Sequence, residues 1–112
     1  MTDAELVDAL AATLANRRAI LPSSKIEWDE DPLVRLAVER LWIMAGNTSA
    51  AYLRSVGLPA GVEPWGELAG YRNLLAPALA GDVSSDRVWA DTTTDLDRII
   101  YAIDRLRTQH PA

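Results

Sequence analysis

The chain of 112 residues contains no cysteine and only one histidine, His110. Without cysteine it can form no disulfide, no thiolate nucleophile and no cysteine-ligated zinc or iron–sulfur site. A single histidine close to a chain end is more often solvated than catalytic. The sequence also lacks a histidine pair, a glycine-rich phosphate loop and a calcium loop, so it predicts no metal and no cofactor.

Long apolar runs are missing too, since none approaches the ~18 residues of a membrane span. The first residues, 1–5, are acidic, and therefore neither a signal peptide nor an anchor is expected. Eleven Lys and Arg oppose sixteen Asp and Glu, for a net charge of −5. Coating nucleic acid through general charge is thus not expected, and any RNA contact must be local. The composition predicts one cytoplasmic domain over residues 1–112.

The apolar residues that are present recur at helical spacing, and no alternating β-branched run occurs, which predicts an all-α fold. A first helix is expected over residues 3–20, where leucines four apart form a stripe that Thr2 or Asp3 could cap. Acidic residues crowd the segment 22–31. This segment is expected to be a solvated loop.

A second helix is expected over residues 32–56, with Asp31 as its N-cap and Gly57 as a left-handed stop. Two apolar stripes run along this helix, although a surface helix needs only one. The second stripe includes Leu36 and Ile43. It indicates either burial of one of these residues at a two-fold homodimer interface or a central position in a tight bundle.

A third helix is expected to open at Pro64 and to end or kink at Pro77. After Gly81, Ser84 or Ser85 should cap a fourth helix, which carries the clearest apolar stripe of the chain. The stripe consists of Val88, Thr92, Leu96, Ile99, Ile100, Ile103 and Leu106. Because the connections are short, the four helices are expected to form an up-and-down bundle.

Two further groups of residues allow a functional interpretation beside a structural one. Acidic residues around Asp29 could attract a hard cation, but they lack the spacing of a ligand cage and fit a solvated loop. Tryptophans could stack on nucleic acid bases, but in helices they are more often core or interface anchors. The tryptophans are Trp28, Trp42, Trp65 and Trp89.

Motif-like residues follow one another in a definite order along the second, third and fourth predicted helices. They are Ala37-Val38-Glu39-Arg40, Gly46, the run Pro64-Trp65-Gly66-Glu67-Leu68-Ala69-Gly70-Tyr71-Arg72-Asn73-Leu74-Leu75, Gly81, Val88-Trp89 and Asp95-Leu96. In order and spacing, the region 31–106 resembles the HepT-like branch of the HEPN domains. The resemblance implies a four-helix bundle, in agreement with the periodicity.

The resemblance also implies a ribonuclease toxin that works as a homodimer, paired with a minimal nucleotidyltransferase antitoxin. The family signature is Arg, four residues, His, one residue, Tyr. Metal-free RNA cleavage needs a base for the 2′-hydroxyl proton and a cation for the developing charge. Arg72 and Asn73 match the start of the signature and are the candidate catalytic residues. Pro77 and Leu79 stand at the His and Tyr positions, and neither can transfer a proton.

Other positions depart from the family pattern as well. Tyr71 adjoins Arg72 but points about 100° away on a helix, so it is a poor substitute for the lost groups. Leu79 has no hydroxyl for the antitoxin to modify with AMP. Ile43 and Asn47 stand where the second helix of the family usually carries glutamates, which indicates a more apolar cleft.

Two functions remain open at this point. The first is a HepT-like component of a prokaryotic toxin–antitoxin module with a degenerate ribonuclease motif, and the second is a non-catalytic HEPN scaffold that docks a partner protein such as a nucleotidyltransferase. Arg72 would contact a phosphate in the first case, or else pair with a carboxylate of a neighbouring helix. Asn73 could instead cap the turn that Pro77 forces.

Overall fold

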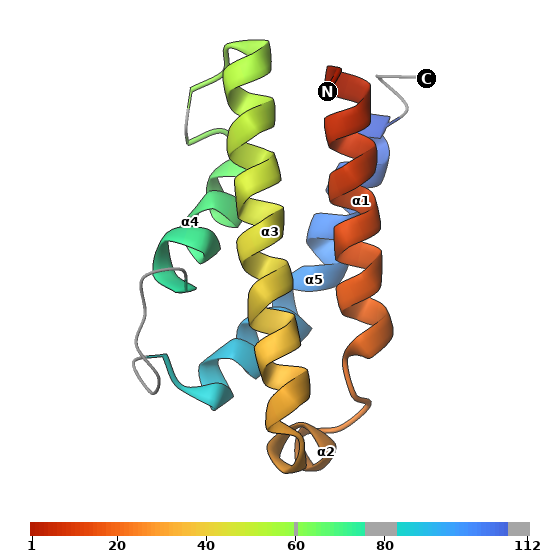
Figure 1. The fold of residues 1–112 in the computed structure, drawn as a ribbon, viewed down its shortest axis with the longest axis vertical. Coiled ribbons are helices and arrows are strands. Elements are labelled where there is room, and N and C mark those ends of the chain that lie inside the picture. Colours follow the sequence, from red (N-terminus) through yellow and green to blue (C-terminus); the bar gives the residue numbers. More distant parts are fainter. Residues whose placement is uncertain (60, 76–82, 108–112) are drawn as a thin grey trace.

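A computed structural model describes residues 1–59, 61–75 and 83–107, apart from the side chain of Arg17. Within these ranges the chain forms helices and no strand, so the predicted all-α class is confirmed. The helices, shown in Figure 1, are α1 (Asp3–Ile20), α2 (Lys25–Glu30), α3 (Pro32–Val56), α4 (Trp65–Leu75) and α5 (Ser85–Arg107).

The long helix α3 lies at the centre of the molecule. It packs against α4 on one side and α1 on the other, and α5 crosses behind them (Figure 1). α5 packs closely against α1. Among the described residues, by contrast, the Cα atoms of α4 and α5 stay more than 8 Å apart. These two helices therefore meet through their side chains.

The ends of α1 and α3 follow from local capping. The Thr2 hydroxyl accepts a hydrogen bond from the Glu5 N–H (3.1 Å), and the Glu5 carboxylate accepts one from the Thr2 N–H (3.2 Å). The Asp31 carboxylate accepts a hydrogen bond from the Val34 N–H, and Gly57 ends α3 at a φ of 72°. The predicted bounds of both helices are confirmed.

The predicted loop over residues 22–31 is wrong in its middle, where α2 forms. The Ser24 hydroxyl caps this short helix by accepting a hydrogen bond from the Glu27 N–H (3.2 Å). Trp28 is 1% exposed, and its indole N–H donates to the Ser85 hydroxyl at 2.9 Å. Burial of one tryptophan against a distant part of the chain outweighs the acidity of its neighbours.

The later helices begin close to the expected places. α4 begins at Trp65, one residue after the predicted Pro64. Of the two serines that could cap α5, Ser84 does so, because its hydroxyl accepts a hydrogen bond from the Arg87 N–H (3.1 Å). The predicted break at Pro77 lies outside the described residues.

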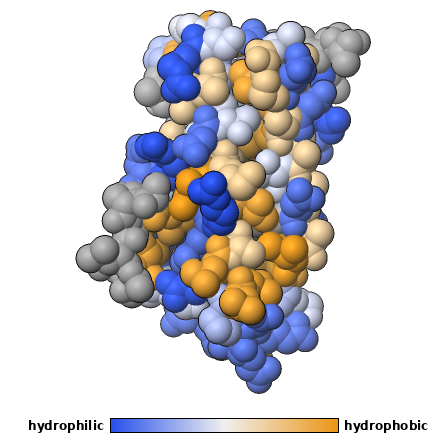
Figure 2. Space-filling view, in the orientation of Figure 1, coloured by the Kyte–Doolittle hydropathy of each residue, from blue (hydrophilic) through white to orange (hydrophobic). Residues whose placement is uncertain are grey.

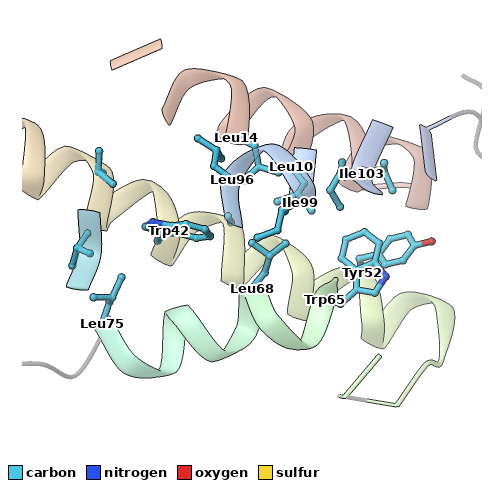
Figure 3. Close-up of a cluster of buried hydrophobic side chains, with 14 of the residues drawn as sticks. Leu10, Leu14, Trp42, Tyr52, Trp65, Leu68, Leu75, Leu96, Ile99 and Ile103 are labelled. Atoms are coloured by element: carbon cyan, nitrogen blue, oxygen red, sulfur yellow. The ribbon is translucent and has the colours of Figure 1, made fainter. Parts of the chain in front are cut away.

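The hydrophobic core contains buried side chains from α1, α3, α4 and α5 that meet between these helices (Figure 3). The predicted stripe of α5 faces this core, with Ile99 and Ile103 fully buried. Each leucine or isoleucine buried in this way contributes about 1.5–3 kcal/mol to folding. The indole N–H of Trp42 donates to the hydroxyl of the buried Thr92 at 2.9 Å, so both polar groups are satisfied.

Hydrophobic surface gathers on the lower half of the face that carries α3 (Figure 2). Leu33 and Leu36, at the start of α3, are 74% and 59% exposed. Ile43, the other candidate for a dimer interface, is partly buried against the core. None of the described helices is long and apolar enough to cross a bilayer.

Candidate functional site

The candidate catalytic residues Arg72 and Asn73 lie on an exposed surface in the last turns of α4. Arg72 Nε donates a hydrogen bond to Asn47 Oδ1 on α3 at 2.8 Å, and Arg72 Nη1 donates to Asn73 Oδ1 at 3.0 Å. Both acceptors are neutral amides. They orient the guanidinium group without neutralising its charge.

The alternative expected for Arg72 was an ion pair with a carboxylate of a neighbouring helix. Within the described ranges Arg72 forms no such pair. Asn73 bonds to Arg72, and the turn that it was expected to cap lies outside the described residues. Arg72 is therefore a charged side chain that two amide groups orient at the surface. Its catalytic role stays a prediction.

The position of Arg72 beside α3 depends on Gly46. A Cβ atom added at Gly46 would lie 2.3 Å from the Cβ of Arg72 and 2.7 Å from the carbonyl oxygen of Leu68. Real Cβ atoms do not approach other atoms this closely, so only glycine allows α3 and α4 to pack at this distance. This close packing is what brings the Arg72 side chain within reach of Asn47.

Tyr71, the neighbour of Arg72, faces α5 instead. Its ring packs against Trp42 with 4.1 Å between ring centroids, and its hydroxyl donates to Asp95 Oδ2 at 2.7 Å. Burial first, and then this hydrogen bond, raise the pKa of Tyr71 far above that of an exposed tyrosine. A phenol held in this way keeps its proton, and it points away from Arg72 as the helical spacing predicts.

Side-chain bonds between α4 and α5 continue around Tyr71. Arg98 on α5 donates to Glu67 on α4 at 2.6 Å and also to Asp95 at 3.2 Å. A surface hollow of about 480 Å³ lies beside this network, between Glu67 and Asp91. The sequence interpretation missed the network, because nothing local shows which carboxylates of α4 and α5 come together.

The two positions where the resemblance places glutamates have different surroundings. Asn47 is exposed and bonds to Arg72, whereas Ile43 packs against the core. The sequence interpretation did not predict the contact between Asn47 and Arg72. The available signal was that both positions belong to the pattern of one family, which is typical of residues that share a site.

Pro77, Leu79 and His110 lie outside the described residues. For the first two, the identity of the residue is enough to decide its chemistry. Proline and leucine carry no side-chain group that accepts or donates a proton, wherever that side chain lies. The signature therefore lacks its proton-transferring groups.

The acidic residues around Asp29 do not form a metal site. Lys25 binds Asp29 at 2.6 Å and Asp86 at 2.7 Å, and these hydrogen bonds raise the pKa of the Lys25 ammonium. Over the part of the chain that the structure describes, no three His, Cys, Asp or Glu residues are grouped to hold an ion. Asp29 is thus paired with a lysine rather than left open to a cation.

The tryptophans belong to the core. Three of them are at most 2% exposed, and Trp89 is partly buried with its ring 5.5 Å from that of Trp28. None of these indoles is displayed as a stacking surface for bases. The predicted structural role of the tryptophans is confirmed.

Comparison with family models, with curated proteins and with solved structures finds no match for this chain. The resemblance to HEPN domains therefore rests on the motif residues of the sequence. Two of these residues, Gly46 and Arg72, contact each other across α3 and α4.

Proposed function

We propose that this protein is a HepT-like HEPN domain of a prokaryotic toxin–antitoxin module whose ribonuclease motif is degenerate. In this proposal α1, α3, α4 and α5 are the helices of the family bundle, and α2 is a short addition. The contact between Gly46 and Arg72 carries the proposal. Both residues belong to the pattern that the resemblance singles out on two separate helices, and the fold makes them neighbours.

In the proposed site Arg72 contacts a phosphate of RNA. Its guanidinium group is exposed, charged and oriented by Asn47 and Asn73, which suits an anion in solution. Cleavage would also need a group that takes the 2′-hydroxyl proton. Pro77 and Leu79 supply none, and the Tyr71 hydroxyl is bound to Asp95 on α5, away from Arg72. We therefore expect RNA binding without cleavage.

A cleavage assay with purified protein, without added metal and beside an intact family member, tests the degenerate motif. We expect no product above background. Cleavage that disappears in Arg72→Ala would contradict the proposal and reveal a relocated base.

Repair of the motif is the complementary experiment. The double substitution Pro77→His and Leu79→Tyr restores both side chains of the signature, and cleavage or toxicity should then appear. The control is the same double substitution combined with Arg72→Ala, which should be inert. A folded double variant that remains inactive would show that the residues around the motif no longer position these groups for cleavage.

The proposal includes a homodimer through the start of α3. Leu36 is the accessible one of the two candidate residues, and Leu33 is exposed beside it. Light scattering at tens of micromolar protein should give the mass of a dimer, which Leu36→Glu should weaken. A monomeric mass for the unmodified protein would contradict the proposed homodimer.

A second candidate function is a non-catalytic scaffold that docks a partner protein such as a minimal nucleotidyltransferase. Exposed leucines at the start of α3 favour it, because they suit a protein surface better than RNA. A nucleotidyltransferase gene beside this one would support a toxin–antitoxin origin. Failure of the repaired motif to cut RNA would place the scaffold function first.

A further inference from the structure

The outward side of α3 carries a line of residues that are mostly exposed. They follow one another in alternating steps of three and four residues, which places them along one side of a helix. We call them the α3 seam: Ala37, Arg40, Met44, Asn47, Ala51 and Arg54. All are exposed except Ala51, which is partly buried against the core, and Asn47 accepts a hydrogen bond from Arg72 of α4. The seam spans 18 residues, or about 27 Å.

Every second residue of the seam is apolar, namely Ala37, Met44 and Ala51. Small alanines let another helix come close, and a flexible methionine adapts to the shape of its partner. α1 and α4 occupy the two flanks of α3 (Figure 1), and the exposure of the seam residues places them on the side that these two helices leave open. The 3–4 spacing is that of a helix that packs lengthwise against a second helix.

The remaining seam residues add positive charge. Arg40 and Arg54 form no ion pair within the described ranges, and neither does Arg72, which Asn47 holds at the edge of the seam. Basic residues elsewhere do bind carboxylates: Arg18, Lys25, Arg35, Arg87, Arg98 and Arg107. The chain has sixteen acidic residues. Even so, Arg40, Arg54 and Arg72, which lie along or beside the seam, form no ion pair with a described carboxylate.

We propose that the α3 seam docks an amphipathic α-helix of a partner protein that carries acidic residues beside its apolar stripe. Arg40 and Arg54 are 14 residues apart, or about 21 Å along the helix. Two glutamates with the same separation on a docked helix would face them. Arginine pairs well with carboxylates at such contacts. This inference stands on α3 and does not need the RNA-related resemblance.

Two other occupants fit the seam less well. A second copy packed on the seam by a two-fold axis near Asn47 would oppose Arg40 to Arg54, and like charges across an interface are unfavourable. A nucleic acid would leave Met44 and the alanines without an apolar partner. An amphipathic helix with acidic residues would pair with the arginines of the seam and cover its apolar residues.

The test uses two synthetic helical peptides of about 21 residues, or three heptads, with leucines at the seam-facing positions. One peptide carries glutamates beside the leucines and the other carries lysines. Binding to the full-length protein is measured by fluorescence anisotropy at low and high salt. The variants are the double substitution Arg40→Glu and Arg54→Glu and, as a control on α5, Arg87→Glu. Circular dichroism checks that each variant keeps its helix content.

We expect the acidic peptide to bind and the basic peptide to bind at least about tenfold more weakly. The double variant should reverse this preference, and Arg87→Glu should leave it unchanged. Equal binding of the two peptides, or no binding of either to the folded protein, would overturn the proposal. So would acidic-peptide binding that the double variant leaves intact.

Two additional measurements address the other occupants. Polyuridylate that binds the protein and is lost in the double variant would assign the seam to nucleic acid. A dimer that the same variant dissociates in light scattering would assign it to a second copy. Cleavage or its absence in the RNA assay bears on neither result, so the two proposals fail independently.

Discussion

The two sides of α4 are held by different means. Toward α3 the backbones approach so closely that Gly46 has no room for a side chain. Toward α5 the Cα atoms of the described residues stay more than 8 Å apart, and the bonds of Tyr71 and Arg98 bridge the distance. One side depends on a missing side chain, and the other depends on long polar ones.

This difference explains why adjacent residues of α4 have opposite surroundings. Arg72 lies on the close side, where a neutral amide of α3 holds it at the surface. Tyr71 lies on the open side, where its ring is packed and its hydroxyl is bonded to a carboxylate. The side of α4 that faces α3 therefore exposes the charge of Arg72. The side that faces α5 holds the Tyr71 hydroxyl in a hydrogen bond that keeps it protonated.

The largest effect is expected from a substitution on the close side. Gly46→Leu places carbon atoms where the Arg72 Cβ and the Leu68 carbonyl already lie. The clash should lower the free energy of unfolding by about 2–3 kcal/mol, since overpacking forces helices apart. Urea denaturation followed by circular dichroism measures this loss.

The matched control for this prediction is Gly70→Leu in α4. An added Cβ at Gly70 meets no atom within 4 Å, and Gly70 is exposed, so the gain in helix propensity should dominate. This variant should gain about 0.5–1 kcal/mol. Equal stability of the two variants would mean that α3 and α4 do not pack closely at Gly46.

On the open side, Tyr71→Phe removes the hydroxyl that bonds to Asp95. The variant leaves a carboxylate without this donor, and the free energy of unfolding should fall by about 1–2 kcal/mol. Tyr101→Phe is the control, because Tyr101 is 66% exposed and should tolerate the change. A loss of the same size in both variants would contradict the bridging role of Tyr71.

The same hydroxyl predicts a dependence on pH. Burial and the bond to Asp95 raise the pKa of Tyr71 in the folded state. The unfolded chain therefore loses this proton first, near its ordinary pKa of about 10. The stabilisation by the raised pKa is complete below that pH and is lost as the pH rises toward the folded pKa. The stability difference between the protein and Tyr71→Phe should shrink above about pH 10 in urea titrations.

The smallest effect is expected for Arg98→Ala. This arginine bridges Glu67 and Asp95 at the surface, where water and salt screen ion pairs. Arg98→Ala should lower the urea midpoint less than Tyr71→Phe does. At high salt, the midpoints of Arg98→Ala and of the unmodified protein should become equal. A loss as large as that of Gly46→Leu would mean that the ion pairs, rather than the tyrosine, hold α5 to α4.

Much of the fold could be predicted from the sequence where the cause is local. The bounds of α1 and α3 follow from residues that cap their own helix, such as Thr2, Asp31 and Gly57. The missed helix α2 also has a local signal, a serine three residues before a glutamate, but the acidic composition concealed it. The burial of Trp28 could not be predicted, because its partner Ser85 lies 57 residues further along the chain.

The candidate site divides in the same way. The sequence by itself determined that Arg72 and Tyr71 point in different directions, because consecutive side chains on a helix diverge by about 100°. It also determined that positions 77 and 79 carry no proton-transferring group. Only the tertiary structure decided that Arg72 meets Asn47 rather than a carboxylate, since that choice depends on how closely two helices pack. Helical geometry is set residue by residue, whereas a contact between helices is set by the packing of the whole core.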